Sequence, residues 1–141
     1  MTPRTVAGVE SDWEGPRRWR AAMEDALYGP DGFFVREAPG AHFRTSVHAS
    51  PLFARAVAAL LRRVDESLGR PAELSLVDVG AGRGELTADV LRVLDEADEG
   101  PAGPARRLRP VAVERAARPA GLDARIEWRA DLPPPGSVTG L

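Results

Sequence analysis

Three glycines at alternate positions, Gly80, Gly82 and Gly84, follow an apolar run at Leu74–Val79. Glycine lets the backbone approach a ligand closely and adopt φ values that other residues avoid. A helical apolar pattern resumes after the third glycine, and a helix N-terminus carries unpaired N–H groups and a positive dipole end. A strand, a glycine-rich turn and a helix in this order indicate a site for a nucleotide-like ligand.

The spacing of the glycines separates two kinds of ligand. A dinucleotide site uses G-x-G-x-x-G/A, in which the last small residue allows close packing of helix and strand. Glu85 occupies that place here, and its charge would lie near a doubly charged pyrophosphate. No G-K-[ST] follows, which excludes a Walker loop. An NAD-type oxidoreductase is therefore the less favoured alternative.

S-adenosylmethionine suits these acids better, because it has no phosphate and carries an ammonium group beside its carboxylate. Asp78 is expected to hold the ammonium, directly or through water. Glu114, which ends a second apolar run, is placed to accept hydrogen bonds from the two ribose hydroxyls, the role of the acid at this point in dinucleotide folds. Asp131 is a candidate for the adenine amino group. Each acid also has an explanation without a ligand. Asp78 would then cap the turn, and Glu114 would be a solvated strand end. For Asp131, a purely structural role is as well supported as ligand binding.

Periodicity predicts the elements that position these residues. Helices are expected over Pro16–Tyr28, over Pro51–Leu68 with Ser50 as N-cap, and after the glycines with Leu86, Val90, Val93 and Leu94 on one side. Strands are expected at Leu74–Val79, Pro110–Glu114 and Arg125–Trp128, and loops at Phe33–Ala49 and over residues 98–107. The alternation of helices and strands predicts an α/β fold with a parallel sheet.

The end of the chain affects the sheet. The first strand is apolar enough for a central position, yet Ser137–Leu141 lies where a fourth strand of the usual order would begin. We expect an unpaired edge, which is an aggregation liability. The missing C-terminal part of a larger domain, or a partner chain, is expected to cover it; cover by another segment of this chain is the alternative. We divide the chain into an N-terminal helical cap or extension, 1–72, and the first part of a Rossmann-like cofactor-binding domain, 73–141.

Composition excludes several function classes. The 141 residues carry a formal net charge of −2 and no cysteine. A disulfide framework, a thiolate metal site and a cysteine nucleophile are therefore excluded. No basic field favours nucleic acid or an anionic membrane, and no apolar run is long enough to span a bilayer. His42 and His48 lack a third ligand, so no metal is expected. We expect a cytoplasmic protein.

Three segments in order resemble the MidA-type family of class I S-adenosylmethionine-dependent methyltransferases. They are Leu76–Arg92, which includes the glycine turn, Ala26–Phe34, similar to the family's A-L-Y-D-P-x-x-G-Y-Y, and Gly40–Phe53, similar to its G-D-F-x-T-S-P-E-x-S-x-x-F. The resemblance implies a Rossmann-like fold and, as in characterised relatives, methylation of arginine on a protein. It also implies that Gly80, Gly82 and Gly84 line the cofactor, together with the intervening Ala81. Thr45 and Ser46 would lie near its methionine end.

The chain departs from the family at His42, which replaces an acid, and at Val47 and His48, which replace Pro-Glu. No catalytic residue is therefore assigned. The leading hypothesis is a methyltransferase with S-adenosylmethionine as cofactor and a protein as substrate, poorly active as this chain alone. A non-catalytic assembly or interaction protein that keeps the fold is the alternative of another class.

Overall fold

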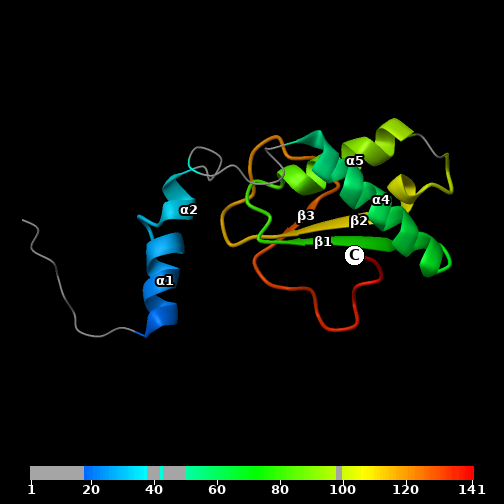
Figure 1. Cartoon of the computed structure of the whole chain (residues 1–141). Coiled ribbons are helices and arrows are strands. Elements are labelled where there is room, and N and C mark those ends of the chain that lie inside the picture. The colour runs from blue at the N-terminus through cyan, green and yellow to red at the C-terminus, as the bar shows by residue number, and fades with distance from the viewer. Residues whose placement is uncertain (1–17, 38–41, 43–49, 98–99) are drawn as a thin grey trace, which may run out of the picture.

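The computed structural model describes residues 18–37, 42, 50–97 and 100–141 (Figure 1). The first helix, α1, spans Trp19–Tyr28 and lies within the predicted helix. A short helix, α2 (Phe33–Arg36), follows at once. The prediction of a loop was wrong at α2, where the N–H groups of Val35 and Arg36 donate to the carbonyl of Gly32 at 3.0 and 3.1 Å.

The longest of the described helices, α4, spans Pro51–Ser67 and confirms the predicted helix. Its start is capped as the sequence predicts, because the Ser50 hydroxyl accepts a hydrogen bond from the backbone N–H of Leu52 at 3.1 Å. Its end is followed by Gly69, which has a φ of +72°. Glycine tolerates this left-handed conformation, so it ends helices readily.

Three parallel strands form the sheet in the order β1-β2-β3. Strand β1 spans Leu74–Val79, β2 Leu108–Val113 and β3 Glu127–Arg129. Helix α5 (Glu85–Ala97) connects β1 to β2. A second short helix, α6 (Pro104–Arg107), occupies part of the predicted loop, so the loop prediction was wrong there as well.

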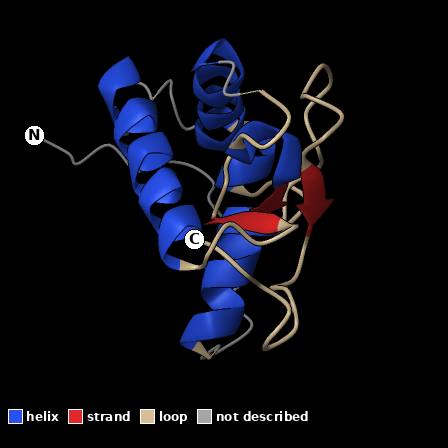
Figure 2. Ribbon diagram, turned by 90° about the vertical axis from the view of Figure 1, so that its right-hand side faces the viewer, coloured by secondary structure: helices blue, strands red, loops and turns tan. Residues whose placement is uncertain are grey.

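The core lies between the sheet and the pair of helices α4 and α5, which run along one face of the strands in Figure 1. Figure 2 shows the strands at the centre of the molecule, seen along their direction. The first core cluster joins three elements: Ala54, Ala58 and Leu61 of α4, Leu74 and Leu76 of β1, and Val90 and Leu94 of α5. Helix α4 therefore packs into the same core as the sheet. In the predicted division of the chain it lies in the N-terminal part, 1–72.

The outer edge of β1 is partly covered by the chain itself. Thr139 and Leu141 accept hydrogen bonds from the N–H groups of Ser75 and Val77 at 2.7 and 2.8 Å, and the N–H of Leu141 donates back to the Ser75 carbonyl at 3.0 Å. The last residues therefore extend the order to a fourth strand position beside β1, on the side opposite β2. Past this pairing, at the end of β1, Val79 is 64% exposed.

Candidate functional site

The glycine turn joins β1 to α5, and its three glycines all have left-handed φ angles. The φ of Gly80 is +76°, that of Gly82 +60° and that of Gly84 +80°. The N–H groups of Gly80 and Ala81 donate to the carbonyl of Val113 at 2.9 and 3.3 Å, which ties the turn to the end of β2. Any side chain at these positions would strain the backbone.

The two ends of the turn differ in the space around them. A Cβ at Gly84 would lie 3.1 Å from the Leu122 side chain and 3.4 Å from Trp128, whereas a Cβ at Gly80 would meet no atom within 4 Å. The side chain of Ala81 is buried in a second core cluster, which it forms with Leu91, Ala112 and Ile126. The turn is therefore packed against the core at Gly84 and open at Gly80, where a ligand can approach the backbone.

Glu114, directly after β2, contacts the turn from the neighbouring strand. Its side-chain oxygen Oε2 accepts a hydrogen bond from the N–H of Gly82 at 3.1 Å. Its other oxygen, Oε1, accepts from the N–H groups of Arg115 and Ala116 at 2.7 and 3.0 Å. Only 8% of the residue is exposed. Backbone N–H groups thus hold this carboxylate at the place where the sequence predicts ribose recognition.

Asp78 lies within β1, one residue before its end, and accepts a hydrogen bond from the Thr87 hydroxyl of α5 at 3.2 Å. Burial raises the pKa of Asp78, and the charges of Glu85 and Glu114 raise it further, while the Thr87 hydrogen bond lowers it. Three carboxyl groups therefore share this end of the sheet. Such a concentration of acids favours a cationic ligand group such as an ammonium.

Glu85 begins α5, and one of its carboxylate oxygens accepts a hydrogen bond from the backbone N–H of Arg83 at 3.0 Å. The carboxylate thus takes up one donor at the helix N-terminus, where a dinucleotide fold would place its pyrophosphate. This geometry agrees with the sequence argument against a dinucleotide.

The structure brings most of the predicted site together. Residues gathered around the turn are Asp78, Gly80, Ala81, Gly82, Gly84 and Glu114. Asp131 is exposed beyond β3, and the structure does not bring it into this group. Thr45 and Ser46 lie outside the described residues, so their predicted place near the methionine end stays a prediction.

Sequence reasoning missed three residues at the site. Thr87 is fully buried beneath Asp78. Tyr28, at the end of α1, has its pKa raised by burial and then by the charge of Glu114. Arg115 contacts Tyr28, with Cζ 5.1 Å from the ring centroid. Of the three, only Thr87 could have been predicted from the sequence, because a hydroxyl in the first turn of α5 lies near the end of β1.

Two hollows in the surface lie away from the turn. A small one, of about 120 Å³, lies between α4 and α6, and a shallow groove of about 590 Å³ runs between α4 and residues 138–140. Neither includes a residue of the predicted site. Among the described residues, no group of three His, Asp or Glu side chains is arranged to hold a metal ion. None of the described helices has the length and apolarity to cross a membrane.

Residues 52–119 match the family described as "Putative S-adenosyl-L-methionine-dependent methyltransferase". The matched stretch runs from α4 past Glu114 and so contains the glycine turn. A search of curated proteins finds no match.

The fold is similar to a crystal structure described as that of a "likely methyl transferase from Burkholderia thailandensis bound to S-adenosyl-homocysteine". The TM-score is 0.56 and the sequence identity 26%. The likeness covers 80% of this chain and 32% of that one. The chain therefore spans less than a third of the length of that neighbour.

Proposed function

Because the family match and the structural likeness both support the S-adenosylmethionine-dependent methyltransferase family for this chain, we propose that its glycine turn and Glu114 bind S-adenosylmethionine for methyl transfer. The observation that carries the proposal is the hydrogen bond from the Gly82 N–H to Glu114. It places the strand-terminal acid against the turn, so one ligand can contact both. The bound cofactor would supply a methyl group activated on a sulfonium.

The residues present fit such a ligand. A carboxylate has about four lone-pair sites, of which Glu114 uses three for backbone N–H groups. Oε2 keeps one lone pair free for a ribose hydroxyl while it holds the Gly82 N–H. Gly80 offers open backbone beside it. Asp78 supplies a carboxylate for the ammonium group. These side chains bind and orient the cofactor; the acceptor nitrogen, whose proton must leave as the new N–CH₃ bond forms, binds elsewhere.

We propose a protein as the substrate, with arginine as the acceptor, on the resemblance to the MidA-type family. Holding the acceptor nitrogen in line with the sulfonium lowers the entropic part of the barrier to methyl transfer. The enzyme's main task is therefore to align these two groups. Labelled methyl transfer by the full-length protein to matched peptides that carry Arg, Lys or neither tests this. Selective labelling of the Arg peptide is expected. Equal labelling of the Lys peptide would contradict the arginine preference.

Calorimetry with S-adenosylhomocysteine tests the cofactor site. We expect the folded wild type to bind, and Glu114→Ala to weaken binding roughly 10- to 100-fold, the usual effect of losing a hydrogen bond to a charged group. Glu127→Gln is a matched control, because Glu127 is a β3 carboxylate paired with Arg109 and not with the turn. No binding by the folded chain, or unchanged affinity in Glu114→Ala, would remove the assignment.

NADH serves as the competing ligand in the same measurement. The methyltransferase proposal expects no NADH binding, since the charge of Glu85 opposes a pyrophosphate at the start of α5. NADH binding that strengthens in Glu85→Gly would instead support the oxidoreductase. Binding of S-adenosylhomocysteine without transfer to any peptide would support the non-catalytic interaction protein.

A further inference from the structure

Arg115 connects the candidate site to α1. Its backbone N–H donates to Glu114 Oε1 at 2.7 Å. Its guanidinium lies over the ring of Tyr28, and one guanidinium nitrogen donates to Glu24 Oε1 at 3.3 Å. A cation over an aromatic ring at this distance is attracted by the ring's negative face. One residue therefore contacts both the ribose-binding acid and two residues of α1.

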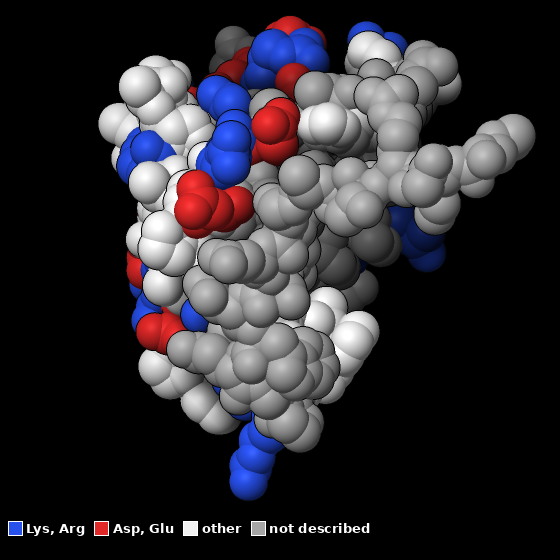
Figure 3. All heavy atoms as spheres, turned by 90° about the vertical axis from the view of Figure 1, so that its left-hand side faces the viewer, with Lys and Arg blue, Asp and Glu red and all other residues white. Residues whose placement is uncertain are grey.

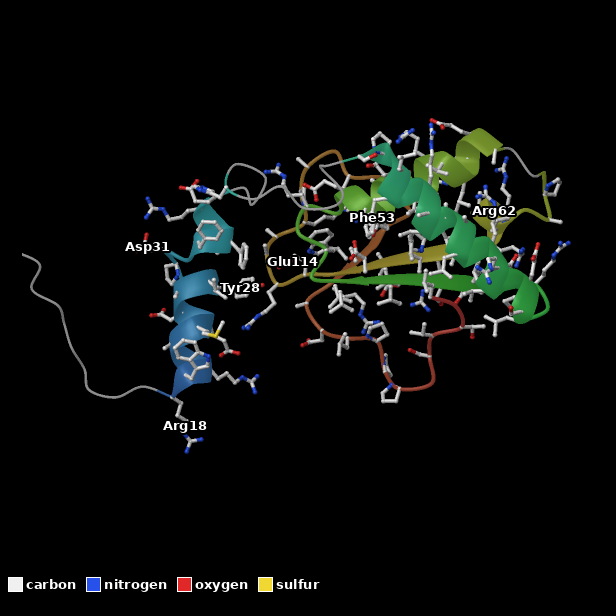
Figure 4. All side chains as sticks on the ribbon, viewed as in Figure 1. Arg18, Tyr28, Asp31, Phe53, Arg62 and Glu114 are labelled. Atoms are coloured by element: carbon white, nitrogen blue, oxygen red, sulfur yellow. The ribbon has the colours of Figure 1, made fainter. Side chains whose placement is uncertain are left out.

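Tyr28 is placed close to Glu114 by these contacts. Burial raises the pKa of its phenol, the charge of Glu114 raises it further, and the charge of Arg115 lowers it. Figure 4 shows Tyr28 on the side of α1 that faces Glu114. Its ring also packs against Phe34, with the ring centroids 5.5 Å apart. The phenol thus lies over the same end of the sheet as the glycine turn.

Helix α1 is shallowly packed within the part of the chain that the structure describes. None of its residues is buried, and Trp19 and Met23 on the helix are 79% and 41% exposed. Among the described residues, Arg115 joins α1 to this end of the sheet through the Tyr28 ring and Glu24. An element with so little buried apolar area opens at low free-energy cost. The helix is therefore a segment whose position a bound ligand can determine.

We propose that α1 is a cap over the cofactor site, in which Tyr28 contacts the ribose end of the bound cofactor and Arg115 positions Tyr28. The proposal rests on the proposed function, because it takes the ribose to lie at Glu114. An aromatic ring with a polar tip suits this place, since its face covers the sugar while its hydroxyl reaches an oxygen. Tyr28 is then a binding residue and Arg115 a positioning residue.

On the side of the molecule where α1 and α2 lie, Figure 3 shows acidic and basic side chains next to one another. An ordinary surface ion pair is therefore the competing explanation for Arg115. Arg20 provides the control, because it also pairs with Glu24, within the helix, at 3.2 Å. Arg20 and Arg115 hold the same carboxylate oxygen, but only Arg115 reaches Tyr28 and the site.

Calorimetry with S-adenosylhomocysteine separates the two explanations. Tyr28→Ala and Arg115→Ala are each expected to weaken binding roughly tenfold, the loss of one good ring or polar contact. Arg20→Ala is expected to bind as the wild type does. Tyr28→Phe tests the hydroxyl alone and is expected to fall between the wild type and Tyr28→Ala. Unchanged affinity in both Tyr28→Ala and Arg115→Ala overturns the cap.

A second measurement uses the fact that Tyr28 is the only tyrosine of the chain. The ultraviolet absorbance of tyrosinate therefore reports the pKa of this phenol, which Glu24, Glu114 and Arg115 face. S-adenosylhomocysteine is expected to raise that pKa, because the bound ligand buries the phenol further. In Arg115→Ala the pKa falls towards its ordinary value if α1 is released, and rises if the helix stays and only the cation is lost. The rise would overturn the positioning role.

Failure of the cap is distinguishable from failure of the proposed function. A wild type that does not bind S-adenosylhomocysteine removes both. If binding requires Glu114 but the affinity is unchanged in the Tyr28 and Arg115 variants, the cap proposal is wrong and the cofactor-site proposal is retained.

Discussion

Glu114 accepts a hydrogen bond from the backbone N–H of Gly82, 32 residues earlier in the chain, at 3.1 Å. The same carboxylate holds the N–H groups of Arg115 and Ala116. It therefore fixes the turn after β1 and the turn after β2 to each other. A residue proposed for ligand binding is at the same time part of what shapes the site.

Replacement of this carboxylate is expected to destabilise the fold as well as the complex. Glu114→Ala leaves three partly buried N–H groups without their carboxylate, which costs about 1–3 kcal/mol of unfolding free energy. Urea denaturation followed by circular dichroism measures this. Glu127→Ala, which removes a half-exposed carboxylate of β3, should change the midpoint far less. Equal midpoints for Glu114→Ala and the wild type would show that water replaces the carboxylate without loss.

The raised pKa of Asp78 predicts a pH-dependent stability. Burial is the main cause, so the folded state holds this proton more tightly than the unfolded chain does. The folded protein therefore loses stability from Asp78 as the pH rises from the ordinary aspartate pKa through the raised one. Asp78→Asn should remove this loss. Urea midpoints of both proteins across the acid range test it, and parallel pH profiles would contradict it.

The same group predicts a pH-dependent affinity. A cofactor ammonium next to Asp78 favours the ionised carboxylate, so binding must expel the proton. Affinity for S-adenosylhomocysteine should rise with pH through the raised pKa and then level off. Calorimetry at several pH values measures this, and Asp78→Asn should bind more weakly with a flatter profile. Glu127→Gln, at a β3 carboxylate paired with Arg109 and not with the turn, is the matched control. A profile of Asp78→Asn as steep as that of the wild type would count against ammonium binding here.

Gly140 should be required for the pairing of the last residues with β1. A Cβ at this position would overlap the carbonyl oxygen of Ser75, and the φ of Gly140 is +156°. Gly140→Ala is therefore expected to detach Thr139–Leu141. Hydrogen exchange at the N–H groups of Ser75 and Val77, which these residues protect, should accelerate.

Gly136→Ala is the control for this variant. Gly136 also has a positive φ, +76°, but no atom lies within 4 Å of the added Cβ. Backbone strain alone would accelerate exchange at Ser75 and Val77 equally in both variants. That result would refute a specific need for close approach at Gly140.

Asp65 and Arg107 form a buried ion pair between α4 and the end of α6. Arg107 donates to both carboxylate oxygens, at 2.9 and 2.6 Å, and the Asp65 side chain is only 5% exposed. Asp65→Ala leaves the guanidinium without its carboxylate, and we expect a loss of about 3 kcal/mol in unfolding free energy. Arg92→Ala, which removes exposed pairs within α5, should leave the urea midpoint unchanged. A similar midpoint for both variants would contradict the expectation.

Local patterns predicted the elements that carry their own signal. Strand β1 was predicted at its observed bounds, because its apolar run is bounded by Glu73 and by glycine. Helix α4 was predicted within a residue, since a serine cap and a long periodic run define it. The two four-residue helices were missed, because four residues are too few to show a helical period. Strand β2 begins two residues before its predicted start, at Leu108.

The candidate site likewise has features that the sequence predicts and features that depend on tertiary packing. The sequence alone determined the glycine turn and the acid at the end of the second strand, because both follow directly from local residue types and strand ends. Only the tertiary structure decided that Arg115 reaches Glu24, 91 residues away, that Tyr28 lies near Glu114, and that the chain's last residues pair with β1. Contacts across such separations depend on how the elements pack, and packing leaves no period or motif in a single sequence.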